Sequence, residues 1–317
     1  MVSEISKPNK LIHLAHPIAQ QSARLSRRRV RNPSTLRLRV NGAKVCGDNE
    51  WRTPTGPKVT DFKEIDLCNA RESVLIGGLP FEVTDLDTAV RDVVTIAAGS
   101  SDQGLVVRLS NASCVTRASQ DHAYRELFAR PGVTLPDGAP VAWAMRVRAR
   151  FPRKGAPVRG PSFVVEVLDH GRHNDLRHFM IGSSDETLTR FVDDATIRYP
   201  GVNFAGVYAP PAGAAKNGVN DDCIERIAEA KPDIVWIGLD SPEREFAAAA
   251  LADRLPGVFV DLGAHLGVVA GSVRPIPTWI NDSGLAWAYR LLFTPKPFRR
   301  RHLLGNARFI LAVVRGK

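Results

Sequence analysis

Short apolar runs alternate with helical patterns along most of this chain, and this alternation restricts the fold more than any other feature. The runs recur roughly every 20 to 30 residues and carry the β-branched residues of buried strands. Between them, apolar residues recur at helical spacing. The pattern predicts an α/β fold, with a Rossmann-like, mainly parallel sheet, flanking helices and a basic C-terminal helical appendage. Strands are expected at 74–80, 105–109, 133–138, 178–182, 202–208, 233–239 and 258–262, and helices at 84–97, 121–129, 187–194, 221–230 and 242–252. Segment 163–168 fits either a strand or a helix start.

The predicted strand order along the chain also locates the candidate ligand site. In a parallel α/β sheet, ligands bind beyond the carboxyl ends of the strands. Segments that directly follow predicted strands are therefore the candidates, namely 110–111, 136–138, 182–184 and 238–241.

Positive charge is concentrated at the two ends of the chain. Of the formal net charge of +10, residues 1–60 carry +9 and residues 283–317 carry +8, so the body between them is mildly acidic. Such ends favour an anionic partner, either nucleic acid or an acidic membrane face. We divide the chain into a basic, disordered leader at 1–73, an α/β core at 74–275 and a basic amphipathic appendage at 276–317. The leader fits a solubilising segment as well as a tether to an anionic surface.

Cysteine usage and hydropathy together predict the compartment. Cys46, Cys68, Cys114 and Cys223 form no Cys-x-x-Cys pair, and the N-terminus has no apolar core of a signal peptide. A reducing cytoplasm is therefore expected. No stretch approaches 18 uninterrupted apolar residues, so any membrane contact should be peripheral.

The sequence Pro136-Asp137-Gly138 places a carboxylate directly after a predicted strand. Pro-Asp-Gly is also one of the commonest β-turn sequences, so the tripeptide alone indicates a turn. A carboxylate at this edge of the sheet has a second use, because a positioned general base accelerates proton removal by about 10²–10⁴-fold.

Other acidic and histidine residues favour structural roles over a metal site. Asp85 and Asp87 form an Asp-x-Asp, but they lie where a helix is expected to begin, and carboxylates there cap unpaired N–H groups. The histidines at 170, 173 and 178 lack acidic or cysteine partners. The turn after Gly182 is not Gly-x-Gly-x-x-Gly, which argues against a dinucleotide cofactor. We predict no metal and no cofactor.

Several segments in order resemble the WecG/TagA/CpsF family of bacterial glycosyltransferases over residues 74–317. Asn111 lies about 26 residues before Asp137, and Pro140-Val-Ala-Trp-Ala144 follows it. Gly238-Leu-Asp-Ser-Pro-Glu-Arg-Glu245 matches the Gly-Leu-Gly-x-Pro-Lys-Gln-Glu motif of the family in part. The resemblance implies an inverting, metal-independent transfer of a hexosamine-type sugar from a UDP-sugar to a polyprenyl-diphosphate-linked acceptor. A homo-oligomer is compatible with the resemblance.

The resemblance assigns roles to individual residues. Asp137 is the implied catalytic base, and Asn111 belongs to the same catalytic site. The implied substrate-binding residues are Gly182, Ser183, Gly238, Asp240, Ser241, Arg244, Glu245, Arg290 and Arg300.

Departures from the family pattern support an alternative of a different class. The motif lysine is Glu243, its glutamine is Arg244, and the Phe-Asp of the next strand end is Leu266-Gly267. A catalytically reduced nucleotide-sugar-binding or scaffold protein of the same fold is therefore the alternative. Nucleic-acid binding rests only on the basic ends and is not expected, because no aromatic-interleaved surface motif accompanies them.

The C-terminal appendage combines basic, aromatic and apolar residues. Trp287, Tyr289 and an arginine run at 299–301 precede the apolar end at 309–314. This combination favours an anionic membrane surface and a protein bound peripherally at the inner face of the cell membrane. The alternative is a helix docked on the chain's own core, with solvated arginines.

Overall fold

The computed structural model describes residues 72–99, 102–148, 156–182, 184–211, 219–271, 280 and 296–315, with backbone alone for 296–304 and 306. The predicted leader therefore lies outside the described residues, apart from 72 and 73. The boundary predicted between 275 and 276 is likewise outside them.

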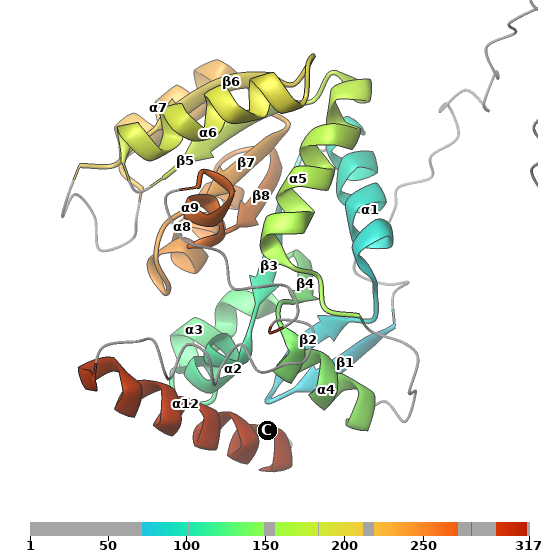
Figure 1. Cartoon of the computed structure of the whole chain (residues 1–317), viewed down its shortest axis with the longest axis vertical. Coiled ribbons are helices and arrows are strands. Elements are labelled where there is room, and N and C mark those ends of the chain that lie inside the picture. The colour runs from blue at the N-terminus through green and yellow to red at the C-terminus, as the bar shows by residue number, and fades with distance from the viewer. Residues whose placement is uncertain are drawn as a thin grey trace, which may run out of the picture. The chain divides into compact units, whose positions relative to one another are not determined.

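Six parallel strands form the central sheet, as the sequence predicted (Figure 1). The order across the sheet is β4-β3-β8-β7-β5-β6, so strands that are distant in sequence pair at its centre. The strands are β3 (Gly104–Ser110), β4 (Gly132–Pro136), β5 (Arg177–Ile181), β6 (Asn203–Tyr208), β7 (Ile234–Ile237) and β8 (Gly257–Asp261). A separate antiparallel hairpin comprises β1 (Ser73–Ile76) and β2 (Leu79–Glu82).

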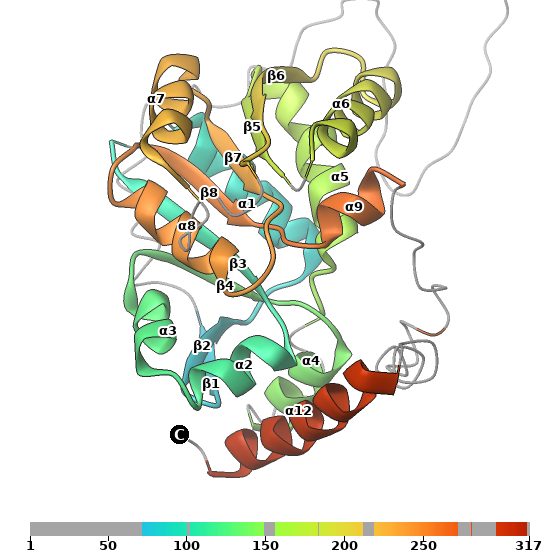
Figure 2. The same ribbon diagram turned by 90° about the vertical axis from the view of Figure 1, so that its left-hand side faces the viewer.

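Both faces of the sheet are covered by helices, which explains why its strands are nearly continuous apolar runs. Alternate strand residues enter two different cores, since successive side chains of a strand point to opposite faces. Val107 and Trp236 pack with α1 (Leu86–Ala98), α5 (Gly160–Gly171) and α6 (Asp185–Arg198). Their neighbours Val106 and Val235 pack with α7 (Asp221–Ala230) and α8 (Glu243–Ala252). Figures 1 and 2 show α1 and α5 side by side over the first face.

A third core lies between the hairpin and the C-terminal helix. It is formed by side chains of the hairpin, α2 (Ala112–Ala118), α3 (His122–Glu126), α4 (Ala139–Arg148) and α12 (Lys296–Arg315). Phe309 and Ala312 of α12 are buried in it, and Thr116 Oγ1 donates a hydrogen bond to Gly305 O at 3.2 Å. The described part of the appendage thus docks on the folded core, below α2 in both views (Figures 1 and 2).

Local sequence signals account for several element boundaries. Asp85 caps α1 by accepting a hydrogen bond from Thr88 N at 2.8 Å, which confirms its predicted role as a helix cap. Segment 163–168, which the sequence left open, is helical and lies within α5. Its buried residues Phe163, Val164, Val167 and Leu168 form one face at helical spacing. Elements that the sequence did not predict are α2, α4, α9 (His265–Val269) and η2 (Arg172–Asn174), whereas η1 (Leu127–Ala129) falls within the helix predicted at 121–129.

Candidate functional site

Three neighbouring strands, β4, β3 and β8, end together on the carboxyl-terminal side of the sheet. β3 lies between β4 and β8, with Ser110 opposite Pro136 and Arg108 opposite Asp261. The residues that follow these strand ends are Asn111, Asp137 and, after a four-residue step from β8, His265. The predicted catalytic pair is therefore brought to one edge of the sheet by direct strand pairing.

Asp137 is held firmly at the end of β4. Its N–H donates to Ser110 O at 2.9 Å, which extends the strand pairing by one residue. The residue is only 8% exposed, and its Oδ2 lies 3.0 Å from His265 Nε2. This burial and contact distinguish Asp137 from a solvated β-turn carboxylate.

Asn111 has a structural role that the sequence analysis did not foresee. It caps α2, with Oδ1 accepting from Ser113 N at 2.9 Å and from Ser113 Oγ at 2.6 Å. The cap fixes the side chain at the strand end, and its Nδ2 is the group that Asn111 can offer a substrate as a hydrogen-bond donor.

The two glycines predicted to shape the nucleotide pocket lie on neighbouring strand ends and pack against α9. Gly182 N donates to Tyr208 O at 3.1 Å, and Gly238 N donates to Ile181 O at 2.7 Å. A Cβ at either glycine would overlap Leu266. The N–H groups of both glycines are therefore used in hydrogen bonds of the sheet. The absence of a side chain at both positions makes room for Leu266. The first turn of α6, which follows Gly182, carries Asp185 and Glu186, whose charge disfavours a phosphate there.

The segment that precedes and opens α8 divides into an exposed and a buried part. Asp240 and Ser241 are exposed, whereas Arg244 and Glu245 are 8% and 3% exposed. Arg244 Nε donates to Glu245 Oε1 at 3.0 Å, and Tyr124 OH donates to the same oxygen at 3.0 Å. Arg244 therefore takes part in an internal ionic network that joins α8 to α3.

Burial sets the protonation behaviour of this network. Burial raises the pKa of Asp261 to about 7, although the Arg244 guanidinium opposes the shift. Burial alone would lower the pKa of Arg244, but Asp261 and Glu245 outweigh it and raise that pKa further. Burial also raises the pKa of the Cys114 thiol to about 11, so this cysteine stays protonated. The positive charge of Arg244 is thus balanced inside the protein.

The comparison with known sequences fits this arrangement of strand ends. The profile of the glycosyl transferase WecG/TagA/CpsF family matches residues 74–317. The chain belongs to this family. It is therefore a glycosyltransferase, as its motifs predicted.

Two relatives of this glycosyltransferase carry the same name, N-acetylglucosaminyldiphosphoundecaprenol N-acetyl-beta-D-mannosaminyltransferase. The protein of Bacillus subtilis (strain 168) is 25% identical over 215 residues, which cover 67% of this chain and 80% of the relative. The protein of Bacillus spizizenii (strain ATCC 23059 / NRRL B-14472 / W23) is 25% identical over 241 residues, or 76% of this chain and 90% of the relative.

Some predicted site residues of this WecG/TagA/CpsF member are not placed beside Asp137. Ser183 and Arg290 lie outside the described residues, and Arg300 lies on α12 where only the backbone is described. The sequence analysis missed His265. Its position after a strand was the available signal, but the pairing of β8 with β3, which brings it to Asp137, joins segments about 150 residues apart.

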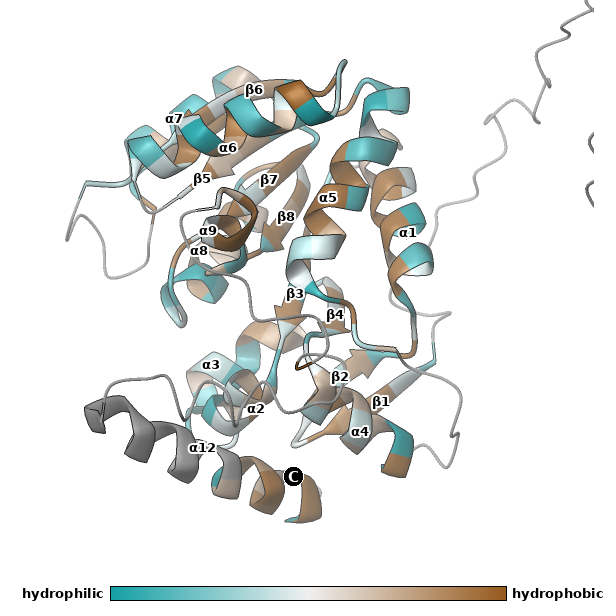
Figure 3. Ribbon diagram, viewed as in Figure 1, coloured by the Kyte–Doolittle hydropathy of each residue, from teal (hydrophilic) through white to brown (hydrophobic). Residues whose placement is uncertain are grey.

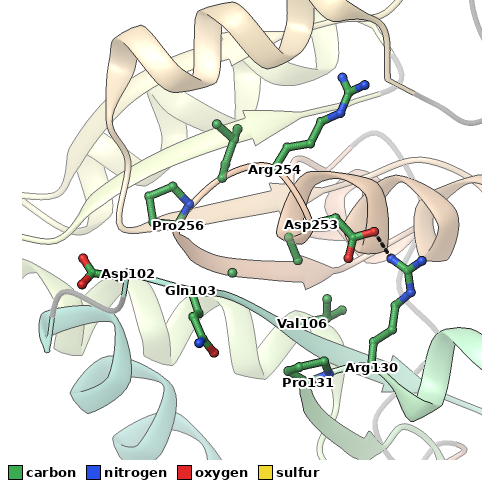
Figure 4. Close-up of a pocket in the computed structure, with 11 residues that line it drawn as sticks. Asp102, Gln103, Val106, Arg130, Pro131, Asp253, Arg254 and Pro256 are labelled. Carbon is green, nitrogen blue, oxygen red and sulfur yellow. Dashed lines mark hydrogen bonds and ion pairs between the residues drawn. The ribbon is translucent and has the colours of Figure 1, made fainter.

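A hollow of about 320 Å³ lies at the opposite end of the same strands (Figure 4). Arg130 and Asp253 form an ion pair at its mouth, and Gly104 at the start of β3 lines it. Because ligands of parallel sheets bind at the carboxyl ends, we place the glycosyltransferase site at Asp137 and not in this hollow.

Within the described residues, no group of three or more His, Cys, Asp or Glu side chains is placed to hold a metal ion. Among the described helices, none has the length and apolar character needed to cross a bilayer.

Proposed function

We propose that this glycosyltransferase is an inverting enzyme that moves a hexosamine-type sugar from a UDP-sugar to a polyprenyl-diphosphate-linked acceptor in exopolysaccharide or cell-wall glycan synthesis. The observation that carries the proposal is the enclosed Asp137 carboxylate beside Asn111 at the paired ends of β4 and β3. The names of the two Bacillus relatives support the lipid-diphosphate acceptor.

The chemistry requires a base on the acceptor side. As the acceptor hydroxyl attacks the anomeric carbon through an oxocarbenium-like state, Asp137 removes its proton. Asn111 Nδ2 donates a hydrogen bond to a sugar or phosphate oxygen. The departing UDP carries negative charge, which cationic side chains and N–H donors stabilise without a metal.

The donor site in this proposal lies along the carboxyl ends of β5 and β7. The exposed Asp240 and Ser241 contact the donor directly, while the buried Arg244 and Glu245 support the loop from beneath. Gly182, Ser183 and Gly238 shape the floor of the nucleotide pocket, and Arg290 and Arg300 engage phosphates.

The lipid-linked acceptor places the enzyme at a membrane surface, which we propose is the cytoplasmic, anionic face of the cell membrane. The C-terminal end of α12 is hydrophobic (Figure 3), with Ile310 and Val314 62% and 76% exposed. Arg315 follows on the same helix, and α4 presents exposed Trp143 and Val147. Apolar and basic groups together are what interfacial binding requires.

A turnover assay tests the proposal. Full-length protein is incubated with a synthetic polyprenyl-diphosphate-linked sugar and a panel of UDP-sugars, with and without EDTA. Transfer of one sugar with inverted anomeric configuration, insensitive to EDTA, is expected. Transfer with retention, or none from any UDP-sugar, would overturn the proposal.

A non-catalytic nucleotide-sugar-binding protein is the second candidate. The internal neutralisation of Arg244 and the acidic first turn of α6 favour it, because both reduce the positive charge available to a diphosphate. Isothermal titration with UDP and UDP-sugars distinguishes the two. Binding without turnover supports this candidate.

A further inference from the structure

His265 contacts the carboxylate of the proposed base. It opens α9 directly beyond the end of β8, and its Nε2 lies 3.0 Å from Asp137 Oδ2. The two side chains are 20% and 12% exposed. This is not a solvated surface pair of the kind whose contribution is negligible.

Packing holds the imidazole ring and the segment that carries it. A Cβ at Gly160, the first residue of α5, would overlap the ring, so the ring lies directly against that helix backbone. The next residue, Leu266, is buried between the ends of β5 and β7 and anchors α9. Gly263, on the loop that precedes His265, lies against the Arg244 guanidinium. The buried ionic network therefore supports the loop that carries His265.

We propose that His265 is a positioning residue that orients the Asp137 carboxylate for proton removal. An ionised carboxylate only accepts hydrogen bonds, so the Nε2–H of His265 donates to Oδ2. This bond holds the carboxylate in one orientation for the acceptor hydroxyl. The inference rests on the proposed role of Asp137 as the base.

The step balances without any further reactant. The acceptor O–H bond breaks as its oxygen bonds to the anomeric carbon, and the proton goes to Oδ1 of Asp137. The bond from that carbon to the diphosphate breaks, and its electron pair leaves with UDP. His265 keeps its Nε2 proton throughout and acts on the reaction only through the base.

Substitutions at position 265 separate positioning from folding. His265→Leu removes the donor and should lower kcat by about 10–100-fold with KM for the UDP-sugar within about twofold, because small misplacements of a reacting group have effects of this size. His265→Gln places an amide N–H near the position of Nε2 and should recover most of the loss. The control is His122→Leu, which removes a histidine paired with Glu126 at 3.3 Å on the surface, where both side chains are over 60% exposed. It should keep wild-type kcat.

Gly160 provides an independent test of the ring's position. Gly160→Ala should displace the ring and lower kcat as His265→Leu does. In a His265→Ala background the added methyl meets no ring, so Gly160→Ala should then have little further effect. Additive losses in kcat would overturn the inference.

A measurement without substrate separates this inference from the proposed function. Long-range ¹H–¹⁵N spectra of the full-length protein near pH 8, with His265 assigned by His265→Gln, report which ring nitrogen carries the proton. We expect the proton on Nε2 in wild type. In Asp137→Leu the ring should no longer favour Nε2 over Nδ1. An Nδ1-protonated ring, or unchanged kcat in His265→Leu, overturns the inference. If wild type transfers no sugar, the proposed function fails, and the spectra alone decide whether the pair exists.

Discussion

At the scale of single residues, partial enclosure and a histidine contact distinguish Asp137 from two other carboxylates near strand ends. Asp240 is exposed, and Asp261 is fully buried at the end of β8, where it accepts from Leu109 N at 2.6 Å. Asp137 lies between these extremes at 8% exposed, and it is the one of the three that contacts a histidine. The sequence predicted Asp137 because its motif is local, whereas the histidine reaches it through tertiary pairing that no local pattern encodes.

Asp137→Asn should lower turnover by about 10²-fold or more, because the amide keeps the size of the side chain but cannot accept the proton. UDP binding should stay nearly intact. Both quantities are measured on one preparation, by sugar transfer and by titration calorimetry. Unchanged turnover would remove Asp137 from the mechanism, and lost binding would make it a structural turn residue.

His178 is a core residue whose titration should affect stability. It is fully buried in β5, and its Nδ1 accepts a hydrogen bond from Trp236 Nε1 at 3.2 Å. Burial lowers the pKa of His178 to about 4, from 6.5 in an unfolded chain. The unfolded chain therefore binds this proton more readily. The stabilising contribution of the neutral ring is complete above pH 6.5 and is lost as the pH falls toward 4, by about 3 kcal/mol in all.

Comparison with His178→Gln isolates this effect. The free energy of unfolding of both proteins is measured in urea from pH 7.5 to 4.5. On acidification it should fall by roughly 2 kcal/mol more for wild type than for the variant. Asp261 acts in the opposite direction over this range, because burial raises its pKa to about 7. Its contribution is common to both proteins and cancels in the difference. A difference that stays constant with pH would contradict the prediction.

At the scale of elements, hydrophobic periodicity predicted whether most segments form a helix or a strand, but not the position of each element in the fold. α1 and the strand at 234–237 were foreseen because caps and apolar runs are local signals. α2 and α9 have seven and five residues, too few for a helical period to show. The order β4-β3-β8 depends on side-chain packing between distant segments. In the motif around Arg244, the buried Arg244 and Glu245 join α8 to α3, a contact that no local pattern predicts, and substrate binding by this motif stays a prediction.

Arg244→Met should destabilise that junction by about 3–5 kcal/mol, because it leaves the charges of Glu245 and Asp261 buried without their cation. Adding Glu245→Gln should restore part of the loss. Urea unfolding gives the free energies. The control is Arg226→Met, which removes an exposed pair with Asp222 within α7 and should change stability by less than about 1 kcal/mol. Equal effects at the two sites would contradict a buried ionic junction.

At the scale of the whole molecule, the described part of the C-terminal appendage docks on the core and leaves an apolar face exposed. Phe309 and Ala312 dock α12 on the core, while Ile310, Leu311 and Val314 are exposed on the same helix. α4 lies next to α12, since Arg148 Nη1 of α4 donates a hydrogen bond to Val313 O of α12 at 3.3 Å. Deleting the appendage would uncover the third core, so point substitutions on the exposed face test membrane contact more cleanly.

Ile310→Gln with Val314→Gln should weaken sedimentation with anionic vesicles by about tenfold or more at low salt. Burying each side chain in the interface contributes on the order of 1 kcal/mol, because its exposed apolar area leaves water. Ile197→Gln on α6, a residue 77% exposed, is the matched control and should sediment as wild type does. Raising the salt concentration should weaken binding of all three proteins, since basic residues of the appendage contribute electrostatically. If the double variant binds vesicles as tightly as Ile197→Gln, the exposed face of α12 is not the contact surface, and the basic leader becomes the candidate anchor.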